Sequence, residues 1–311
     1  MDFISLFSKF VTFIALMLVG YVGARRKIFA PAFAKSLSWL VINVFLSLTI
    51  LNSVTSNSPD LSGRQILNVL AMTSIAMLTG YVLALIIVRI FKIHTDNAPV
   101  FQLLVSVPNT MFVGMPIVQS VYGSTAVLYC ALSCIPFNVL LYTWGVLILR
   151  RGKSAAGGAG IRLKDMLTTP LIFTLVALAV FALKLPLPTL VADLVSTGAA
   201  ATVPTSMIVI GATLGGVKLS DAFRERRAYI ISLFRLIAAP LLTWLILRMF
   251  TTDAVLLATC TIISACPCGV IVSAMSLQYD YDAEFSSKGV LVTTVLSMVT
   301  LPVLVMLLAG V

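Results

Sequence analysis

The sequence predicts an all-α polytopic membrane protein, and three observations support this fold class. Hydrophobic residues make up 60% of the 311 residues and charged residues only 10%, with a mean hydropathy of +1.09. Soluble globular domains do not have such a composition. Apolar segments long enough to cross a bilayer follow one another along the whole chain. Two of these segments carry a proline near the centre, Pro108 and Pro267, where a helix is expected to break.

Hydropathy divides the chain into ten predicted transmembrane helices. They lie at about residues 3–23, 34–51, 66–91, 98–121, 125–149, 166–183, 190–211, 228–250, 254–277 and 285–309. A basic, glycine-rich stretch at residues 150–164 is expected to be a flexible cytoplasmic linker. It separates two five-helix units, residues 1–149 and 165–311. No predicted loop is long enough to fold alone, which excludes an attached nucleotide-binding or catalytic domain.

The distribution of basic residues predicts the orientation. Loops after the odd-numbered helices carry 16 lysines and arginines, the opposite side carries 4, and Arg235 lies inside the eighth helix. Basic loops stay in the cytoplasm, so both termini are expected in the periplasm. Each unit has five helices, an odd number, so the second unit enters the membrane inverted. The broken fourth and ninth helices should then cross as antiparallel partners.

The fourth predicted helix is the first of the two broken ones. Within residues 98–121 it contains Pro108, Asn109 and Pro116. Proline lacks a backbone donor and clashes with the preceding turn, so the helix should break or kink here. An interrupted backbone at membrane depth is tolerated only where protein or a water-filled cavity surrounds it. Transporters commonly place their substrate site at such a break.

The ninth predicted helix repeats this feature at a constant offset. Adding 159 to Pro108 gives Pro267, at the centre of Ser-Ala-Cys-Pro-Cys-Gly (264–269). The same offset relates three further pairs: Arg89 with Arg248, Phe91 with Phe250, and Tyr122 with Tyr281. The chain therefore looks like two copies of one unit with a proline-broken helix in each, the sequence signal of a transporter binding site.

The motif Asn-Thr-Met-Phe-Val-Gly-Met-Pro (109–116) resembles the broken-helix motif of the auxin efflux carrier family, which includes plant PIN carriers and bacterial carriers often labelled malonate transporters. Further loose matches lie at 138, 169–170, 210–214, 235–240 and 297–302. The resemblance covers essentially the whole chain. It implies a fold like that of the bile-acid sodium symporters, with a scaffold domain moving against a crossover domain, in the bacterial inner membrane. One departure is Asn43, which has no proline shortly after it.

The breaks and nearby polar residues are the candidate substrate site. Each second half-helix begins with free N–H groups and a partial positive charge that suit a carboxylate, at 110–114 and 268–270. Asn109 adds an amide, unless it only caps its own helix. For Asn43 and Asn138 the alternative is hydrogen bonding between packed helices. The predicted substrate-binding residues are Asn43, Pro108, Asn109, Thr110, Met111, Asn138, Tyr142, Cys266, Pro267, Cys268 and Gly269.

Charged residues inside the membrane are scarce. All eleven acidic residues lie at or near predicted helix ends, so no midplane carboxylate is available for proton coupling, while sodium coupling stays open. Arg235 follows Arg227 by eight residues, about 12 Å along a helix. We expect its side chain to reach the cytoplasmic interface and not to serve as a counter-charge for an anion. Asn109→Ala should then weaken anion binding far more than Arg235→Gln.

Other chemistries are not expected. The five cysteines lie in apolar segments, so no disulfide framework is implied. Cys266-Pro267-Cys268 resembles a Cu(I)-binding pair, but an ATP-driven metal pump needs cytoplasmic domains, so these cysteines are expected to pack only. With one histidine, His94, and no midplane carboxylate pair, we predict no enzyme, metal site or cofactor. The net charge of +10 lies in short loops and indicates topology, not nucleic-acid binding.

The sequence therefore predicts a secondary transporter of small organic anions, working by alternating access with its site where the fourth and ninth helices cross. The family-level expectation is a carboxylate such as malonate, or an auxin-like indole carboxylate. The alternatives are a sodium-coupled organic-anion symporter and a non-transporting membrane sensor of the same fold. The expected partners are the anion and the lipid bilayer, and a homodimer is left open.

Overall fold

The computed structural model describes residues 3–30, 32–55, 62–91, 93, 97–152, 167–183, 185, 187–216 and 219–308. Within these ranges all regular elements are helical, and seven helices are long and apolar enough to cross a membrane. Two further apolar helices, α9 (Thr169–Ala182) and α15 (Ala254–Ala265), are shorter. The polytopic all-α class is confirmed. Most of the predicted linker, from residue 153 on, lies outside the described residues.

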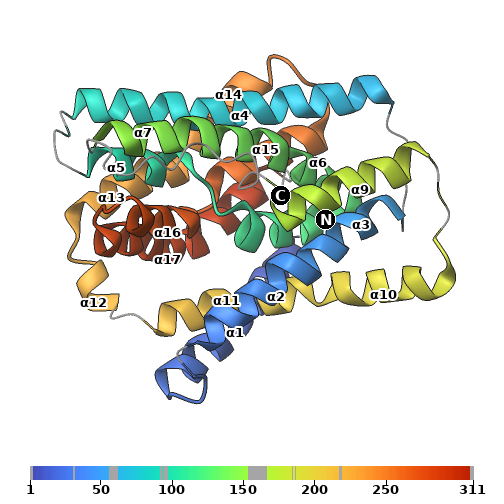
Figure 1. The fold of residues 1–311 in the computed structure, drawn as a ribbon, viewed down its shortest axis with the longest axis horizontal. Helices are drawn as coiled ribbons and strands as arrows, with labels where there is room; N and C mark the ends of the chain where they lie inside the picture. The colour runs from blue at the N-terminus through green and yellow to red at the C-terminus, as the bar shows by residue number, and fades with distance from the viewer. Residues whose placement is uncertain are drawn as a thin grey trace.

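One set of helices, which we call the α1–α11 group, is built on the contact between α1 and α11 (Figure 1). In this group α3 packs against both α9 and α10, and α11 also contacts α2. Its members are α1 (Phe3–Arg25), α2 (Phe33–Leu40), the π-helical turn η1 (Val41–Phe45), α3 (Leu46–Thr55), α9, α10 (Thr189–Ala200) and α11 (Thr202–Gly215).

Glycines let the backbones of α1 and α11 touch. A Cβ atom at Gly211 would lie 1.8 Å from the carbonyl oxygen of Met17, and one at Gly20 would lie 2.1 Å from that of Ile208. Gly215 follows Gly211 by four residues, which places both on one face of α11. Small residues at this spacing are how membrane helices pack closely, because van der Waals contact replaces the hydrophobic effect as the source of association.

The remaining helices form the second set, which we call the crossover group. Its longest helix, α4, contacts α5, α6, α14 and α15 (Figure 1). The members are α4 (Gly63–Ile90), α5 (Ala98–Ser106), η2 (Thr110–Gly114), α6 (Met115–Leu140), η3 (Leu141–Gly145), α7 (Val146–Gly152), α12 (Leu219–Ala222), α13 (Arg226–Leu233), η4 (Phe234–Ala238), α14 (Ala239–Leu247), α15, α16 (Ile271–Gln278) and α17 (Ala283–Leu308).

The fourth and fifth predicted helices join without a loop. Gly123, with φ 73° and ψ −157°, makes a sharp bend inside α6, between the residues assigned to the two predicted helices. This conformation is open to glycine and strained for other residues. A single glycine therefore serves as the connection that hydropathy placed between residues 121 and 125.

In the described part of the chain, three π-helical turns interrupt longer helices and a fourth begins one. Asn43 lies in η1, Tyr142 in η3 and Arg235 in η4, while η2 follows the first break. A π-helical turn inserts one residue into the helix and is frequent at functional sites. At Asn43 the π-helical turn makes the helix irregular although no proline shortly follows this residue.

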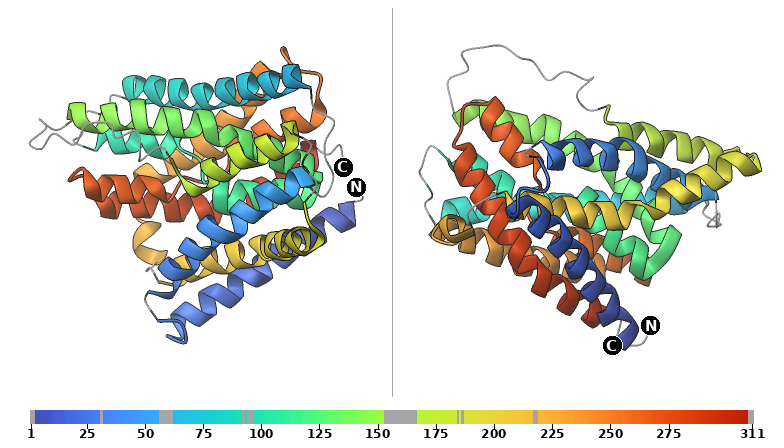
Figure 2. Two further views of the ribbon diagram at one scale, coloured as in Figure 1. Left: turned by 45° about the vertical axis from the view of Figure 1, so that its right-hand side comes forward. Right: turned by 90° about the horizontal axis from the view of Figure 1, so that it is seen from below.

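The two groups meet mainly along α6 and α17: α3 and α9 contact α6, and α1 contacts α17. The start of α1 and the end of α17 lie at the same end of the molecule in both views of Figure 2. The two broken helices belong to the crossover group, and the face that they turn toward α11 carries the candidate site.

Candidate functional site

The first break lies between α5 and η2. Val107 adopts an extended conformation, with φ −95° and ψ 110°, as expected for a residue before a proline. Asn109, with φ −83° and ψ 65°, precedes the next helical turn. The second break lies between α15 and α16, where Cys266 is extended with φ −61° and ψ 147°. Both sequence-predicted breaks are therefore present.

The breaks pair with each other, and we call residues 107–109 and 267–269 the break seam. The Asn109 amide donates to the Pro267 carbonyl at 2.8 Å, and the Gly269 amide donates to the Val107 carbonyl at 2.9 Å. Together these bonds form a short antiparallel bridge between the segments. An unpaired backbone N–H or carbonyl group costs several kcal/mol of free energy in hydrocarbon. The two seam hydrogen bonds remove this cost for the groups that they pair. The bridge therefore gives each break a partner for one N–H group and one carbonyl group.

Gly269 permits this close approach. A Cβ atom at position 269 would lie 3.0 Å from the Pro108 carbonyl oxygen and 3.1 Å from Val107 Cγ1. The Cys268 amide is also used within the protein, since it donates to Thr293 Oγ1 on α17 at 3.1 Å. The expectation that the N–H groups of Cys268 and Gly269 stay free for an anion is therefore wrong. Thr293 accepts from the Cys268 amide, and the break seam uses the Gly269 amide because the two breaks lie within hydrogen-bonding distance.

Asn109 both caps its helix and faces a cavity. Its Oδ1 accepts from the Phe112 amide at 3.4 Å, which is the capping role. Its side chain also lines the crossover pocket described below. Nearby, the Thr110 hydroxyl is 4% exposed, and no hydrogen-bond partner for it occurs among the described residues. A buried hydroxyl without a partner has unused donor and acceptor capacity beside the break.

Arg235 is buried inside the crossover group, with 2% of its surface exposed. Its guanidinium donates to four backbone carbonyls: those of Cys266 at 2.9 Å, Val105 at 3.0 Å, Ser106 at 3.2 Å and Ile263 at 3.4 Å. The expected reach to the cytoplasmic interface is wrong. The ends of α5 and α15 offer backbone carbonyls near η4, and these can replace the water that an interfacial guanidinium would seek.

A pocket of about 180 Å³ separates the breaks from the α1–α11 group. We call it the crossover pocket. Its volume is below that of a drug-sized site and suits a ligand of few heavy atoms. Neutral hydroxyls and one amide are its polar groups, and no charged side chain lines it among the described residues. The lining residues are Ser38, Asn109, Phe112, Val209, Ile210, Thr213, Leu214, Val270, Ser273, Ser287, Val290, Leu291 and Thr294.

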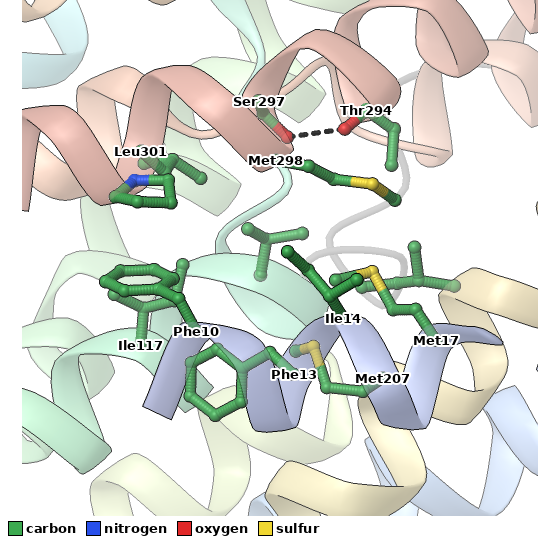
Figure 3. A pocket seen from close by; sticks show the side chains of 13 residues that line it. Phe10, Phe13, Ile14, Met17, Ile117, Met207, Thr294, Ser297, Met298 and Leu301 are labelled. Atoms are coloured by element: carbon green, nitrogen blue, oxygen red, sulfur yellow. Dashed lines mark hydrogen bonds between the residues drawn. The ribbon is translucent and has the colours of Figure 1, made fainter. Parts of the chain in front are cut away.

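A second cavity of about 30 Å³ adjoins this pocket and shares Ile210 and Thr294 with it. Figure 3 shows it between α1, α17 and neighbouring helices, with phenyl rings and thioethers around it. Met side chains adapt their shape readily. Its polar side chains, Thr294 and Ser297, donate to carbonyls of their own helix, and we interpret the cavity as a loosely packed contact between the two groups. The labelled apolar residues are Phe10, Phe13, Ile14, Met17, Ile117, Met207, Met298 and Leu301.

Apart from Asn109, the predicted site residues do not line the crossover pocket. Asn43 Oδ1 accepts from Thr169 Oγ1 at 2.5 Å and its Nδ2 donates to the Trp39 carbonyl at 2.9 Å, so it joins η1 to α9. Asn138 Nδ2 donates to the Cys134 carbonyl of its own helix at 2.8 Å. For Asn43 the helix-packing alternative describes the contact with Thr169, whereas the Asn138 bond stays within α6. Pro108, Met111, Tyr142, Pro267 and Cys266 also fall outside the pocket lining.

The cysteines are buried free thiols in the described structure. Cys266 Sγ donates to the Ile262 carbonyl at 3.2 Å and Cys268 Sγ to the Leu104 carbonyl at 2.9 Å. Cys266 also packs against the first break, since a Cβ atom at Gly114 would lie 3.1 Å from its sulfur. Among the described residues, no group of three or more histidine, cysteine or acidic side chains is placed to hold a metal ion.

The sequence did not point to Thr293 or to the hydroxyls on α16 and α17 that line the pocket. Serine and threonine are common in membrane helices, where they bond to their own backbone, so their presence carries no signal. For the contact of α1 with α11 a signal was present, because Gly211 and Gly215 form a Gly-x-x-x-Gly motif. For the burial of Arg235 the sequence signal was its position well inside a predicted membrane helix, where charged side chains usually face the protein interior.

Apolar helices, two paired breaks and a pocket at their side are typical of a membrane transporter. The chain matches the family described as membrane transport protein over residues 5–157 and 160–305, and it belongs to that family. It is 24% identical over 297 residues to an uncharacterized transporter of Methanocaldococcus jannaschii, covering 92% of this chain and 93% of that protein. It is also 24% identical over 296 residues to an uncharacterized transporter of Methanothermobacter thermautotrophicus, covering 93% and 94%. The transporter class predicted from the broken helices is thus confirmed.

Proposed function

We propose that this protein is a secondary transporter of small organic anions, with carboxylates such as malonate or auxin-like indole carboxylates as the substrate class. The observation that carries the proposal is the crossover pocket, which lies directly beside the break seam and contains Asn109. The resemblance of residues 109–116 to the auxin efflux carrier motif supports the same class. The small volume of the pocket favours a short carboxylate.

The anion is held by helix starts and neutral donors. The second half-helices begin at Thr110 and Ile271, and the first N–H groups of a helix are open to a ligand where no capping group accepts from them. Asn109 already accepts from Phe112, and Gly269 and Val270 accept from Val272 and Ser273, which leaves the N–H groups ahead of these for the anion. Each helix start also carries a partial positive charge of about half an elementary charge. Asn109 and Val270 bring both starts to the pocket wall. A carboxylate between them receives hydrogen bonds from two directions.

We propose ten membrane-spanning segments arranged as two inverted repeats, residues 1–149 and 165–311, with a fold like that of the bile-acid sodium symporters. The antiparallel pairing of the two breaks and the common end of α1 and α17 support this arrangement. Alternating access follows from movement of the crossover group against the α1–α11 group. The pocket lies between these groups, so their displacement carries the anion from one side to the other.

The proposed location is the bacterial inner membrane, with both termini in the periplasm. A reporter enzyme that is active only in the periplasm is expected to work when fused after Val311 and to stay inactive when inserted after Gly158. The 16-to-4 distribution of basic residues is the reason. Cell fractionation and reporter activity are the measurements. Activity from the insertion after Gly158 but not from the terminal fusion would refute this orientation.

Asn109→Ala tests the site itself. Loss of a hydrogen bond to a charged ligand costs about 1.5–3 kcal/mol, which corresponds to a roughly ten- to hundredfold weaker affinity. Calorimetry with malonate and with indole-3-acetate on purified protein measures this change. The control is Asn68→Ala, which removes an exposed amide from α4. Unchanged affinity in a folded Asn109→Ala protein would place the anion elsewhere, and net uptake into proteoliposomes separates a transporter from a sensor.

A further inference from the structure

Four helix ends meet at the break seam, and their charges oppose one another. α5 and α15 end there, so their last carbonyls contribute partial negative charge, about half an elementary charge for each helix. The two second halves begin there with partial positive charge of similar size. Without another charge, the negative ends would cancel much of the field that the positive ends present to an anion.

Arg235 is placed against the two negative ends. It donates to Val105 and Ser106 of the first broken helix and to Ile263 and Cys266 of the second. Its partners are therefore all backbone carbonyls, and within the described ranges no carboxylate forms an ion pair with it. One positive charge thus offsets two half-charges. The planar guanidinium has five donors in a fixed fork, which lets one side chain bind carbonyls on both helices.

Half-helix ends and unwound carbonyls are the groups with which transporters otherwise coordinate a sodium ion. We infer that Arg235 is a built-in cation of the crossover, which takes the place of a coupling sodium ion and leaves the two positive helix ends free to bind the anion. This inference rests on the proposed function, in that it assumes an anion at the crossover pocket. It makes anion binding independent of sodium and dependent on Arg235.

The first arm of the test uses the wild-type protein. Its thermal unfolding midpoint and its malonate affinity are measured in sodium, potassium and choline chloride at equal ionic strength. Both quantities are expected to be the same in the three salts. A midpoint that rises in sodium alone, or malonate affinity that requires sodium, overturns the inference, because it reveals a cation site that Arg235 does not fill.

The second arm replaces the cation. Arg235→Ala is expected to weaken malonate binding by about tenfold or more, and millimolar guanidinium chloride should restore the affinity where choline chloride does not. A role in packing alone would not respond to a diffusible guanidinium ion. The control is Arg248→Ala, which removes an arginine that stacks on Trp244 and should show neither loss nor rescue. Wild-type affinity in the Arg235→Ala protein would contradict the inference.

Two further measurements keep the outcomes distinct. If Arg235→Ala does not fold, Arg235→Lys keeps the charge without the fork, and its malonate binding is expected to be weakened but still independent of sodium. Sodium-dependent binding by this variant would count against a built-in cation. If malonate binds the wild-type protein in none of the salts, the proposed substrate fails. The inference is then decided by whether guanidinium, but not choline, raises the unfolding midpoint of Arg235→Ala.

Discussion

Gly211→Ala is expected to destabilise the protein by about 3 kcal/mol, or to prevent its accumulation in the folded state. Elsewhere in a helix the same change stabilises by up to about 1 kcal/mol, because alanine is the better helix former. At Gly211 the added methyl carbon would lie 1.8 Å from the Met17 carbonyl oxygen and 2.6 Å from its carbonyl carbon. Backbone atoms cannot move aside as a side chain does, so α1 and α11 must separate.

Gly216→Ala is the matched control, because it adds a methyl group at the end of the same helix. There the nearest atoms lie at 3.6 and 3.7 Å, an ordinary contact distance. Thermal unfolding in detergent, followed by intrinsic fluorescence, compares the two variants. Equal unfolding midpoints would mean that α1 and α11 do not pack as closely as the structure indicates. Any Gly211→Ala protein that does fold should lose less anion affinity than Gly269→Ala, since Gly211 and Met17 do not line the crossover pocket although other residues of α11 do.

Gly269→Ala is expected to abolish transport and to lower stability by about 1–3 kcal/mol. The new methyl carbon would lie 3.0 Å from the Pro108 carbonyl oxygen and 3.1 Å from Val107 Cγ1, so the two breaks must move apart. Separation lengthens both seam hydrogen bonds at once. It also shifts Asn109 and Val270 relative to each other, and these residues carry the two helix starts to the pocket.

The readouts are anion affinity by calorimetry and uptake into proteoliposomes, with the unfolding midpoint beside them. Gly63→Ala serves as the control, because no atom lies within 4 Å of a Cβ at that position. Full transport by Gly269→Ala would show that the seam tolerates widening. The two variants are expected to differ, since Gly211→Ala should reduce mainly the stability, whereas Gly269→Ala should reduce the stability and abolish transport.

The breaks were predictable from the sequence because their cause is local. Pro108 and Pro267 each remove a backbone donor, and the constant offset of 159 residues indicated that they correspond. The pairing of the two segments follows from the same reasoning, since an interrupted backbone in lipid needs a partner. Hydropathy likewise placed most helices within a few residues, because a span depends on the mean of many side chains.

The direction of the Arg235 side chain was not predictable in this way. The side chain points toward lipid or toward the protein interior depending on how its helix is rotated. That rotation depends on which neighbouring helices offer hydrogen-bond acceptors to the guanidinium. The carbonyls at the ends of α5 and α15 that accept from Arg235 lie 28 to 130 residues away along the chain. The π-helical turn that contains Arg235 also has no known residue signature in the sequence. The role of Asn43 likewise depends on a partner far along the chain, Thr169.

The break seam has a consequence for the order in which the protein is made. Asn109 and Val107 find their partners in Pro267 and Gly269, about 160 residues later in the chain. At a synthesis rate of roughly 5–20 residues per second, this delay is on the order of 10–30 s. During that interval the nascent chain contains the first break but not the segment that supplies its hydrogen-bond partners. Biogenesis therefore includes a stage in which the membrane insertion machinery or trapped water must shelter an open backbone, and the protein matures only when its last third arrives.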